Sequence, residues 1–68
     1  MDNRVRDLRT ERGWSQQVLG EKVGVSRQTI IAIERGKYDP SLTLAFEMSR
    51  AFDVPIEDLF LYAGRKNR

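Results

Sequence analysis

Two adjacent residues, Arg27 and Gln28, have the chemistry needed to read base edges in double-stranded DNA. A guanidinium can donate two hydrogen bonds to guanine O6 and N7, and a glutamine amide can pair with adenine N6 and N7, each giving about 1–3 kcal/mol of base discrimination. Further along the same stretch, Ile31 can touch a thymine methyl group and Ala32 leaves room for close approach. These types and spacings suit base reading from one face of a helix, if the surrounding elements present that face to DNA.

A second set of residues has the chemistry to hold the DNA backbone. Gln16 stands in the first turn of a predicted helix, where its amide and the free backbone N–H groups favour an anion. Thr29 suits a phosphate or an adjacent base edge, and cationic or hydrogen-bonding side chains follow the base-reading stretch. The predicted phosphate contacts are Gln16, Thr29, Arg35, Lys37 and Tyr38.

Residues 16–35 must position these side chains, and they have the pattern of a helix-turn-helix. Gly20 stands mid-helix, where a minimal side chain lets the next helix approach closely, and Gly24 makes the turn. Ser15 and Ser26 can cap the two helix starts. At about 100° per residue, the second helix turns Gln28, Ile31, Ala32 and Arg35 outward, with Arg27 flanking. The residues expected to lock the crossing are Leu19, Val23, Val25, Ile30 and Ile33.

Glycine and proline divide the remaining chain into three further segments of helical length. The first spans residues 5–12, and Trp14 after it is expected to pack on Leu19 as a hydrophobic staple. The segment after Pro40 and Ser41 repeats its apolar positions at helical spacing from Leu42 onward, at Leu42, Ala45, Met48 and Phe52. A last short helix is expected over residues 55–60. The predicted fold is all-α, a compact five-helix bundle.

Composition excludes several function classes. The 68 residues contain no cysteine and no histidine, so disulfides, thiolate nucleophiles, imidazole bases and the usual zinc ligand sets are absent. No phosphate-cradling glycine loop is seen, and the adjacent acids Glu57 and Asp58 fit a helix first turn better than acid–base catalysis. We therefore expect no enzyme activity, no metal and no cofactor. Because a chain this short shows no effector-binding domain, we also expect no small-molecule ligand. No apolar run reaches the roughly 18 residues of a membrane span, so we expect a cytoplasmic protein without membrane association.

The net charge is only +2, but the charges are unevenly distributed. Residues 26–38 hold three cations and one acid, Glu34, whereas helix four and the start of helix five hold four acids and one arginine. An acid on a base-reading helix would repel phosphate. Since Glu34 and Arg9 both fall on inward positions, we expect them to form a buried bidentate ion pair that links the first and third helices.

The chain resembles the Cro/CI-type helix-turn-helix family, also called the xenobiotic response element family. Four ordered motifs carry the resemblance, which covers residues 4–61: L-R-T-E-R-G-W-S-Q, G-V-S-R-Q-T-I, I-E-R-G-K-Y-D-P-S-L and A-F-D-V-P-I-E-D-L-F. It implies a phage lambda repressor-like DNA-binding domain, whose third helix reads the major groove. It also implies a bacterial or phage transcription regulator that binds a pseudo-palindromic operator as a homodimer, and it assigns Gln16 to a phosphate. The Arg9–Glu34 pair agrees with the resemblance to phage repressors.

The C-terminal part is expected to supply the dimer contacts, because it has more apolar residues than a closing helix needs. The predicted interface residues are Phe46, Ile56, Phe60, Leu61 and Tyr62. We expect one helix-turn-helix domain over residues 1–61 and a short basic tail over 62–68. Two alternatives to a repressor remain open at this point: an activator, which would look the same, and a DNA-binding antitoxin or restriction-modification controller that acts with a protein partner.

Overall fold

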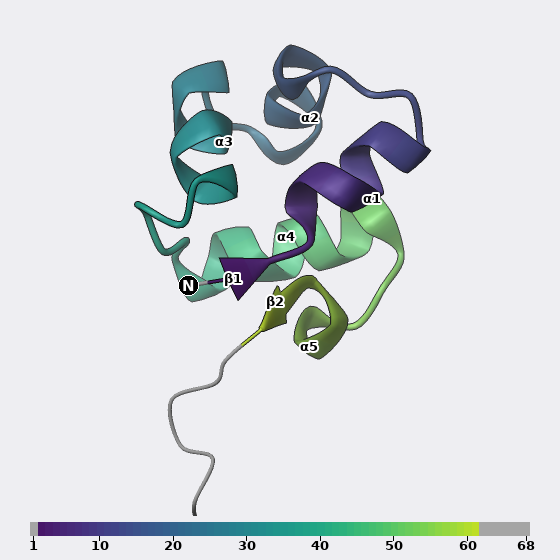
Figure 1. Ribbon diagram of the computed structural model, residues 1–68, viewed down its shortest axis with the longest axis vertical. Coiled ribbons are helices and arrows are strands. Elements are labelled where there is room, and N and C mark those ends of the chain that lie inside the picture. The colour runs from purple at the N-terminus through teal and green to yellow at the C-terminus, as the bar shows by residue number, and fades with distance from the viewer. Residues whose placement is uncertain (1, 62–68) are drawn as a thin grey trace, which may run out of the picture.

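Five helices follow one another along residues 2–61, as the glycine and proline pattern predicts (Figure 1). The computed structural model describes residues 2–61. The helices are α1 (Val5–Glu11), α2 (Gln16–Val23), α3 (Arg27–Glu34), α4 (Leu42–Phe52) and α5 (Ile56–Leu59). The predicted fold class, a compact bundle of five helices, is therefore confirmed. None of these helices has the length and apolar character that crossing a membrane requires.

Serine side chains fix the starts of the three middle helices. The hydroxyl oxygens of Ser15, Ser26 and Ser41 accept hydrogen bonds from the backbone N–H groups three residues later, at 3.0, 3.2 and 3.1 Å. Each bond satisfies one of the amides that a helix start leaves without a partner. At the end of α2, Gly24 takes the left-handed conformation, with φ +80°, so that the chain can turn sharply into α3.

A short antiparallel sheet joins the two ends of the domain, which the sequence pattern did not predict. The strands are β1 (Asp2–Asn3) and β2 (Phe60–Leu61), with Asp2 opposite Leu61 and Asn3 opposite Phe60. The last helix consequently ends at Leu59, one residue earlier than expected. Because β1 also reaches α3 through the Asn3 amide, which donates to the carbonyl oxygen of Ile33 at 2.8 Å, the sheet ties the ends of the domain to the helix-turn-helix.

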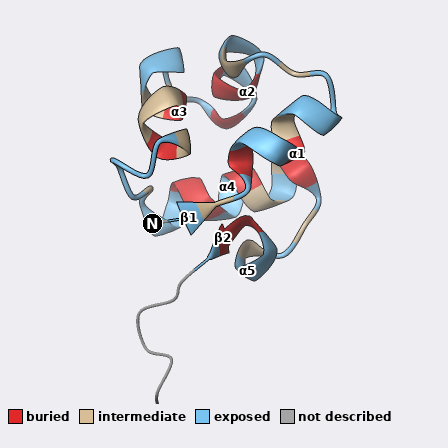
Figure 2. Ribbon diagram, in the orientation of Figure 1, coloured by how far each residue is buried: buried red, intermediate tan, exposed pale blue. Residues whose placement is uncertain are grey.

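Twelve buried apolar residues, contributed by all five helices and β2, form one core. Figure 2 shows the buried segments of the helices turned toward the centre of the molecule. One position of the predicted apolar repeat lies on the surface: Leu42 is 70% exposed, and Leu44 is buried instead. Leu42 is the first residue of α4, and the helix turns that position outward. The buried residues are Val5, Leu8, Leu19, Val23, Ile30, Ile33, Leu44, Ala45, Met48, Phe52, Leu59 and Phe60.

Aromatic and cationic side chains close the edge of the core between α1 and α4. Trp14 stacks on Phe52, with ring centroids 5.4 Å apart, a partner that the expected staple on Leu19 did not include. The Arg12 guanidinium lies over both rings and donates to the backbone carbonyl oxygens of Leu8 and Phe52. The Arg12 side chain, directly after α1, can thus lie along this edge because its charge meets ring faces and helix-end carbonyl oxygens.

Replacing Gly20 with alanine is predicted to destabilise the domain. A Cβ atom at this position would lie 2.6 Å from the backbone carbonyl oxygen of Val25, which cannot move unless the turn and α3 move with it. Alanine gains about 1 kcal/mol of helix propensity, but the overlap costs more. We expect the free energy of unfolding, measured by urea denaturation, to fall by about 1–2 kcal/mol.

The exposed neighbour Glu21 provides the control for this measurement. Glu21→Ala should change the free energy of unfolding by less than about 0.5 kcal/mol. A Gly20→Ala variant as stable as the parent would show that close helix contact at this position does not set the α2–α3 crossing.

Candidate nucleic-acid interface

Helix α3 is divided into an inner and an outer face, as its periodicity predicts. Ile30 and Ile33 are buried in the core. Arg27 and Gln28, at the first turn, are exposed, and Ile31 and Ala32 are partly exposed on the same outer side. The four residues expected to read bases are therefore all accessible from one side of a single helix.

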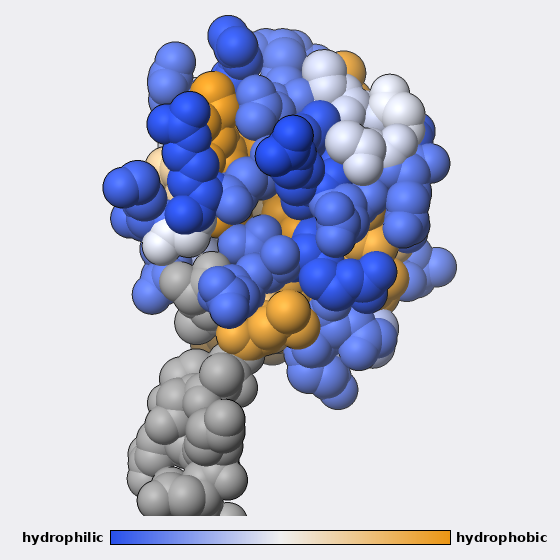
Figure 3. Space-filling model, in the orientation of Figure 1, coloured by the Kyte–Doolittle hydropathy of each residue, from blue (hydrophilic) through white to orange (hydrophobic). Residues whose placement is uncertain are grey.

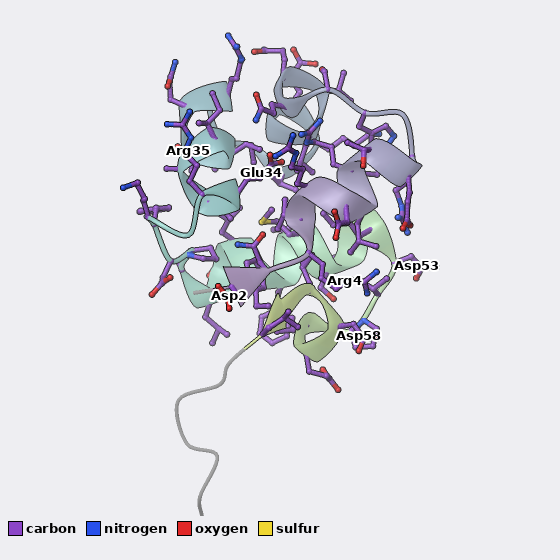
Figure 4. All side chains as sticks on the ribbon, in the orientation of Figure 1. Asp2, Arg4, Glu34, Arg35, Asp53 and Asp58 are labelled. Carbon is purple, nitrogen blue, oxygen red and sulfur yellow. The ribbon has the colours of Figure 1, made fainter. Side chains whose placement is uncertain are left out.

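A cavity of about 660 Å³ opens between α1, the start of α2 and the outer side of α3. Four residues predicted to contact DNA line it: Gln16, Arg27, Ile31 and Arg35. Arg9 and Glu34, the predicted ion pair, line it as well. Figure 4 shows Glu34 turned into the space between these helices and Arg35 on the outer side of α3. The residues lining the cavity are Arg6, Arg9, Ser15, Gln16, Gln17, Arg27, Ile31, Glu34 and Arg35.

The predicted contact between Arg9 and Glu34 is present and bidentate. Arg9 Nε donates to Glu34 Oε2 at 2.7 Å, and Arg9 Nη2 donates to Glu34 Oε1 at 3.2 Å. The two side chains are only 11% and 5% exposed, so both charges are largely removed from water. Arg9 Nη1 also donates to the carbonyl oxygen of Trp14 at 3.0 Å. The pair therefore joins α1, the turn after it and the last residue of α3.

Gln16 takes part in the same network. Its Nε2 atom donates to Glu34 Oε1 at 3.2 Å, which fixes the amide at the first residue of α2. An amide nitrogen carries two hydrogens, so one remains available while the other is held by Glu34. The arrangement orients a polar side chain toward the cavity rather than leaving it to move freely.

Glu34 therefore does not act as a free acid beside the outer face of α3, because its charge is matched by Arg9. The other three arginines of the cavity, Arg6, Arg27 and Arg35, form no ion pair with any carboxylate of residues 2–61. Figure 3 shows a largely hydrophilic surface over α1, α2 and α3, with an apolar strip over α3. The cavity wall is thus positively charged and suited to an anion.

Three other predicted phosphate contacts lie outside the cavity. Thr29 is half-buried in the first turn of α3, where its hydroxyl lies 3.1 Å from that of Ser26. Lys37 and Tyr38 are exposed in the segment just after α3. The backbone N–H of Lys37 donates to the carbonyl oxygen of Ala32 at 3.0 Å, which holds this segment against the end of the helix.

The expected dimer residues do not form one exposed set, and Phe60 is not on the surface. Phe60 is 8% exposed because it pairs with β1 and packs into the core, and Ile56 also packs against that core. Phe46 and Leu61 are exposed, at 53% and 42%. Tyr62 and the expected basic tail lie outside the described residues. Leu42, the first position of the predicted apolar repeat, stands one turn before Phe46 on the surface of α4.

The helix-turn-helix family model matches residues 5–59, more than half of the chain. The chain belongs to the Cro/CI-type helix-turn-helix family. The uncharacterized HTH-type transcriptional regulator MJ0272 of Methanocaldococcus jannaschii is 55% identical to it over 62 residues, which are 91% of this chain and 94% of the relative. This helix-turn-helix protein is a DNA-binding transcription regulator and not an enzyme.

Solved structures of the family have the same fold. The restriction-modification controller protein C.AhdI from Aeromonas hydrophila is 35% identical, with a TM-score of 0.77 over 84% of this chain and 86% of that one. The P22 c2 repressor protein, solved in complex with a synthetic operator, is 30% identical, with a TM-score of 0.77 over 79% of this chain and 82% of that one. Helix-turn-helix domains of this family bind double-stranded DNA.

Sequence reasoning missed Arg6, Ser15 and Gln17 as cavity residues of this regulator. Arg6 stands three residues before Arg9, and this spacing places two residues on neighbouring parts of one helix surface. The inward position of Arg9 was therefore a usable signal that Arg6 also lies near α3. Gln17 gives no comparable signal, because its amide donates to Glu21 as an ordinary helix-surface pair would.

Removing Arg9 is predicted to destabilise this helix-turn-helix domain strongly. Arg9→Ala would leave Glu34 nearly buried without its cation and would remove the bond to the Trp14 carbonyl oxygen. Breaking a buried pair from one side costs about 3–5 kcal/mol, a large part of the stability of a small domain. Urea denaturation should show a loss of that size.

Arg6→Ala provides the matched control, since Arg6 is an exposed arginine on the same helix. Its free energy of unfolding should stay within about 0.5 kcal/mol of the parent. An Arg9→Ala protein that melts at the parent temperature would show that the Arg9–Glu34 contact does not stabilise the fold.

Proposed function

We propose that this regulator is a sequence-specific repressor that binds a pseudo-palindromic operator as a homodimer, with α3 in the major groove. The observation that carries the proposal is the accessible outer side of α3, where Arg27 and Gln28 stand in the first turn beside a cavity lined by arginines. In helix-turn-helix proteins the N-terminal residues of the recognition helix contact base edges. Likeness to the operator-bound P22 c2 repressor adds support.

The residues proposed to face DNA have two roles. We assign base reading to Arg27, Gln28, Ile31 and Ala32, since all four are accessible from one side of the helix. Contacts to phosphates fix the register but carry no sequence information directly. We assign them to residues at the start of α2, in the first turn of α3 and just after α3: Gln16, Thr29, Arg35, Lys37 and Tyr38.

Gln16 is well suited to a phosphate because it is held in place before DNA arrives. Its bond to Glu34 leaves one amide hydrogen for an external acceptor, and the start of α2 also has backbone N–H groups without a partner in the helix. Holding the side chain in advance reduces the conformational entropy lost on binding. Gln16 would then act together with the amides and the dipole of the helix start.

The homodimer would use exposed apolar residues of the α4 and β2 side. Leu42 and Phe46 stand one turn apart on α4 and are 70% and 53% exposed, and Leu61 on β2 is 42% exposed. Figure 3 also shows an apolar patch over the α5 and β2 end of the face in view. A two-fold axis at this side would place two α3 helices about 34 Å apart, one turn of DNA.

A restriction-modification controller is the second candidate function. The observation that favours it is the likeness to the controller protein C.AhdI, which covers 84% of this chain. Both candidates require sequence-specific DNA binding. Restriction and methyltransferase genes beside this gene would favour the controller, and their absence would leave the repressor as the simpler function.

Selection of bound sequences from random duplexes tests the shared part of both proposals. Sequence-specific binding by a dimer should enrich a palindromic motif with half-sites about 10 base pairs apart. A salt titration of the selected duplex should show a steep loss of affinity, because phosphate contacts release counterions. Enrichment of no motif would contradict sequence-specific binding.

Substitutions on α3 and after it should have different effects on DNA binding. Arg27→Ala and Gln28→Ala should each relax preference at one base position and cost about 1–3 kcal/mol on the selected duplex. Lys37→Ala should weaken binding to all duplexes to a similar degree. Fluorescence anisotropy on the selected duplex and single-base variants measures both effects, and uniform losses for all three variants would contradict the division of roles.

A charge placed on the apolar side of α4 should break the dimer. Phe46→Glu puts a carboxylate where a second copy is expected to pack, and burying an unpaired charge is costly. We expect sedimentation equilibrium to show a monomer for Phe46→Glu at concentrations where the parent is dimeric. Val18→Glu, at an exposed apolar residue of α2, is the control and should remain dimeric. A parent that is monomeric both free and on DNA would contradict the homodimer.

A further inference from the structure

Arg6 is an exposed cation that lines the cavity from the side opposite α3. It lies on α1, whereas the proposed DNA contacts come from α2, α3 and the segment after α3. We propose that Arg6 binds a phosphate of the DNA backbone, so that α1 forms a third part of the DNA-binding surface. The inference rests on the proposed function, because it requires that DNA lies along α3.

The charge balance of the cavity supports this role. Four arginines and one acid line it, and Arg9 and Glu34 are paired with each other. Arg6, Arg27 and Arg35 share the opening without a carboxylate partner among residues 2–61. Three guanidinium groups at one opening repel one another, and an anion placed among them lowers that repulsion. Guanidinium groups can also bind phosphate oxygens through two hydrogen bonds.

The position of Arg6 relative to Gln16 indicates how a strand would lie. Gln16 at the start of α2 lines the same cavity, and its amide is already fixed by Glu34. A strand whose phosphate reaches Gln16 while α3 enters the major groove would present its backbone to the opening where Arg6 stands. Arg6 would then hold the strand from α1 while Gln16 holds it from α2.

Arg4 is two residues before Arg6 in the sequence but does not lie at the cavity. It is exposed like Arg6, but it does not line the cavity. In Figure 4, Arg4 lies toward the part of the molecule where Asp53 and Asp58 are labelled, away from Arg35 on α3. The two residues therefore separate a local phosphate contact from the general effect of losing one positive charge.

The experiment compares Arg6→Gln with Arg4→Gln in the full chain, since each variant loses one charge. Binding to the selected duplex and to an unrelated duplex is measured by fluorescence anisotropy across a salt series. Arg6→Gln should lose on the order of tenfold in affinity on both duplexes, the size expected for a hydrogen bond to a charged group. The slope of log K against log salt should fall in magnitude by about 0.9, as for one lost phosphate contact.

Arg4→Gln should keep the parent's salt slope and bind within about twofold of the parent at physiological salt, because screening weakens distant charges. Equal behaviour of the two variants would overturn the assignment of Arg6. Urea denaturation of both variants shows whether a loss of binding comes from unfolding. A parent that binds no duplex would contradict the proposed function itself, whereas a parent that binds while Arg6→Gln binds equally well would contradict only this inference.

A free anion is the other possible occupant of the cavity. Isothermal titration calorimetry of the parent with inorganic tripolyphosphate distinguishes a site for a free anion from a site for a DNA phosphate. Binding of tripolyphosphate that is lost in Arg6→Gln, together with unchanged DNA binding by that variant, would overturn the proposal in favour of a separate anion site. Loss of DNA affinity in Arg6→Gln without specific tripolyphosphate binding by the parent supports the DNA contact.

Discussion

The carboxylate of Glu34 is the interaction on which the DNA-facing side of the molecule depends. It stands at the last residue of α3 and accepts hydrogen bonds from Arg9 on α1 and from Gln16 at the start of α2. One side chain thereby joins three helices around a cavity. It also removes its own negative charge from the outer face of α3, where an unpaired acid would repel phosphate. Stability and recognition are coupled at this residue.

The angle between α2 and α3 is the second constraint. Gly20 lies against the Val25 carbonyl oxygen too closely for any larger side chain, and Gly24 reverses the chain in a left-handed conformation. With this crossing fixed, burial of Ile30 and Ile33 turns the opposite side of α3 to solvent. The apolar core thus determines which residues of α3 are available to DNA, although none of the core residues contacts it in the proposed mode.

Local rules predicted the helix-turn-helix because its signals are short in range. Serine caps, the glycine turn and the spacing of Ile30 and Ile33 each operate within a few residues. The four motifs of the family resemblance agree with these local signals.

Contacts between residues far apart in the sequence were predicted less well. Phe60 was expected at a dimer interface because it is one of many apolar residues near the C-terminal end. Its own segment does not reveal that residues 2 and 3 form a strand beside it. Leu42 belongs to the apolar repeat of α4, but the repeat does not show whether other elements pack over the first turn of that helix. Leu42 is therefore exposed although its spacing matches the buried positions. Arg6 was missed as a cavity residue although the inward position of Arg9, three residues later, gave a signal for it.

A crystal structure of the full chain bound to its selected duplex tests the central claim most directly. The account predicts that α3 lies in the major groove with Arg27 and Gln28 at base edges, while Arg9 and Glu34 remain paired and the cavity faces the sugar-phosphate backbone. DNA bound to another face of the molecule, or an Arg9–Glu34 pair broken so that α3 takes a new orientation, would contradict it.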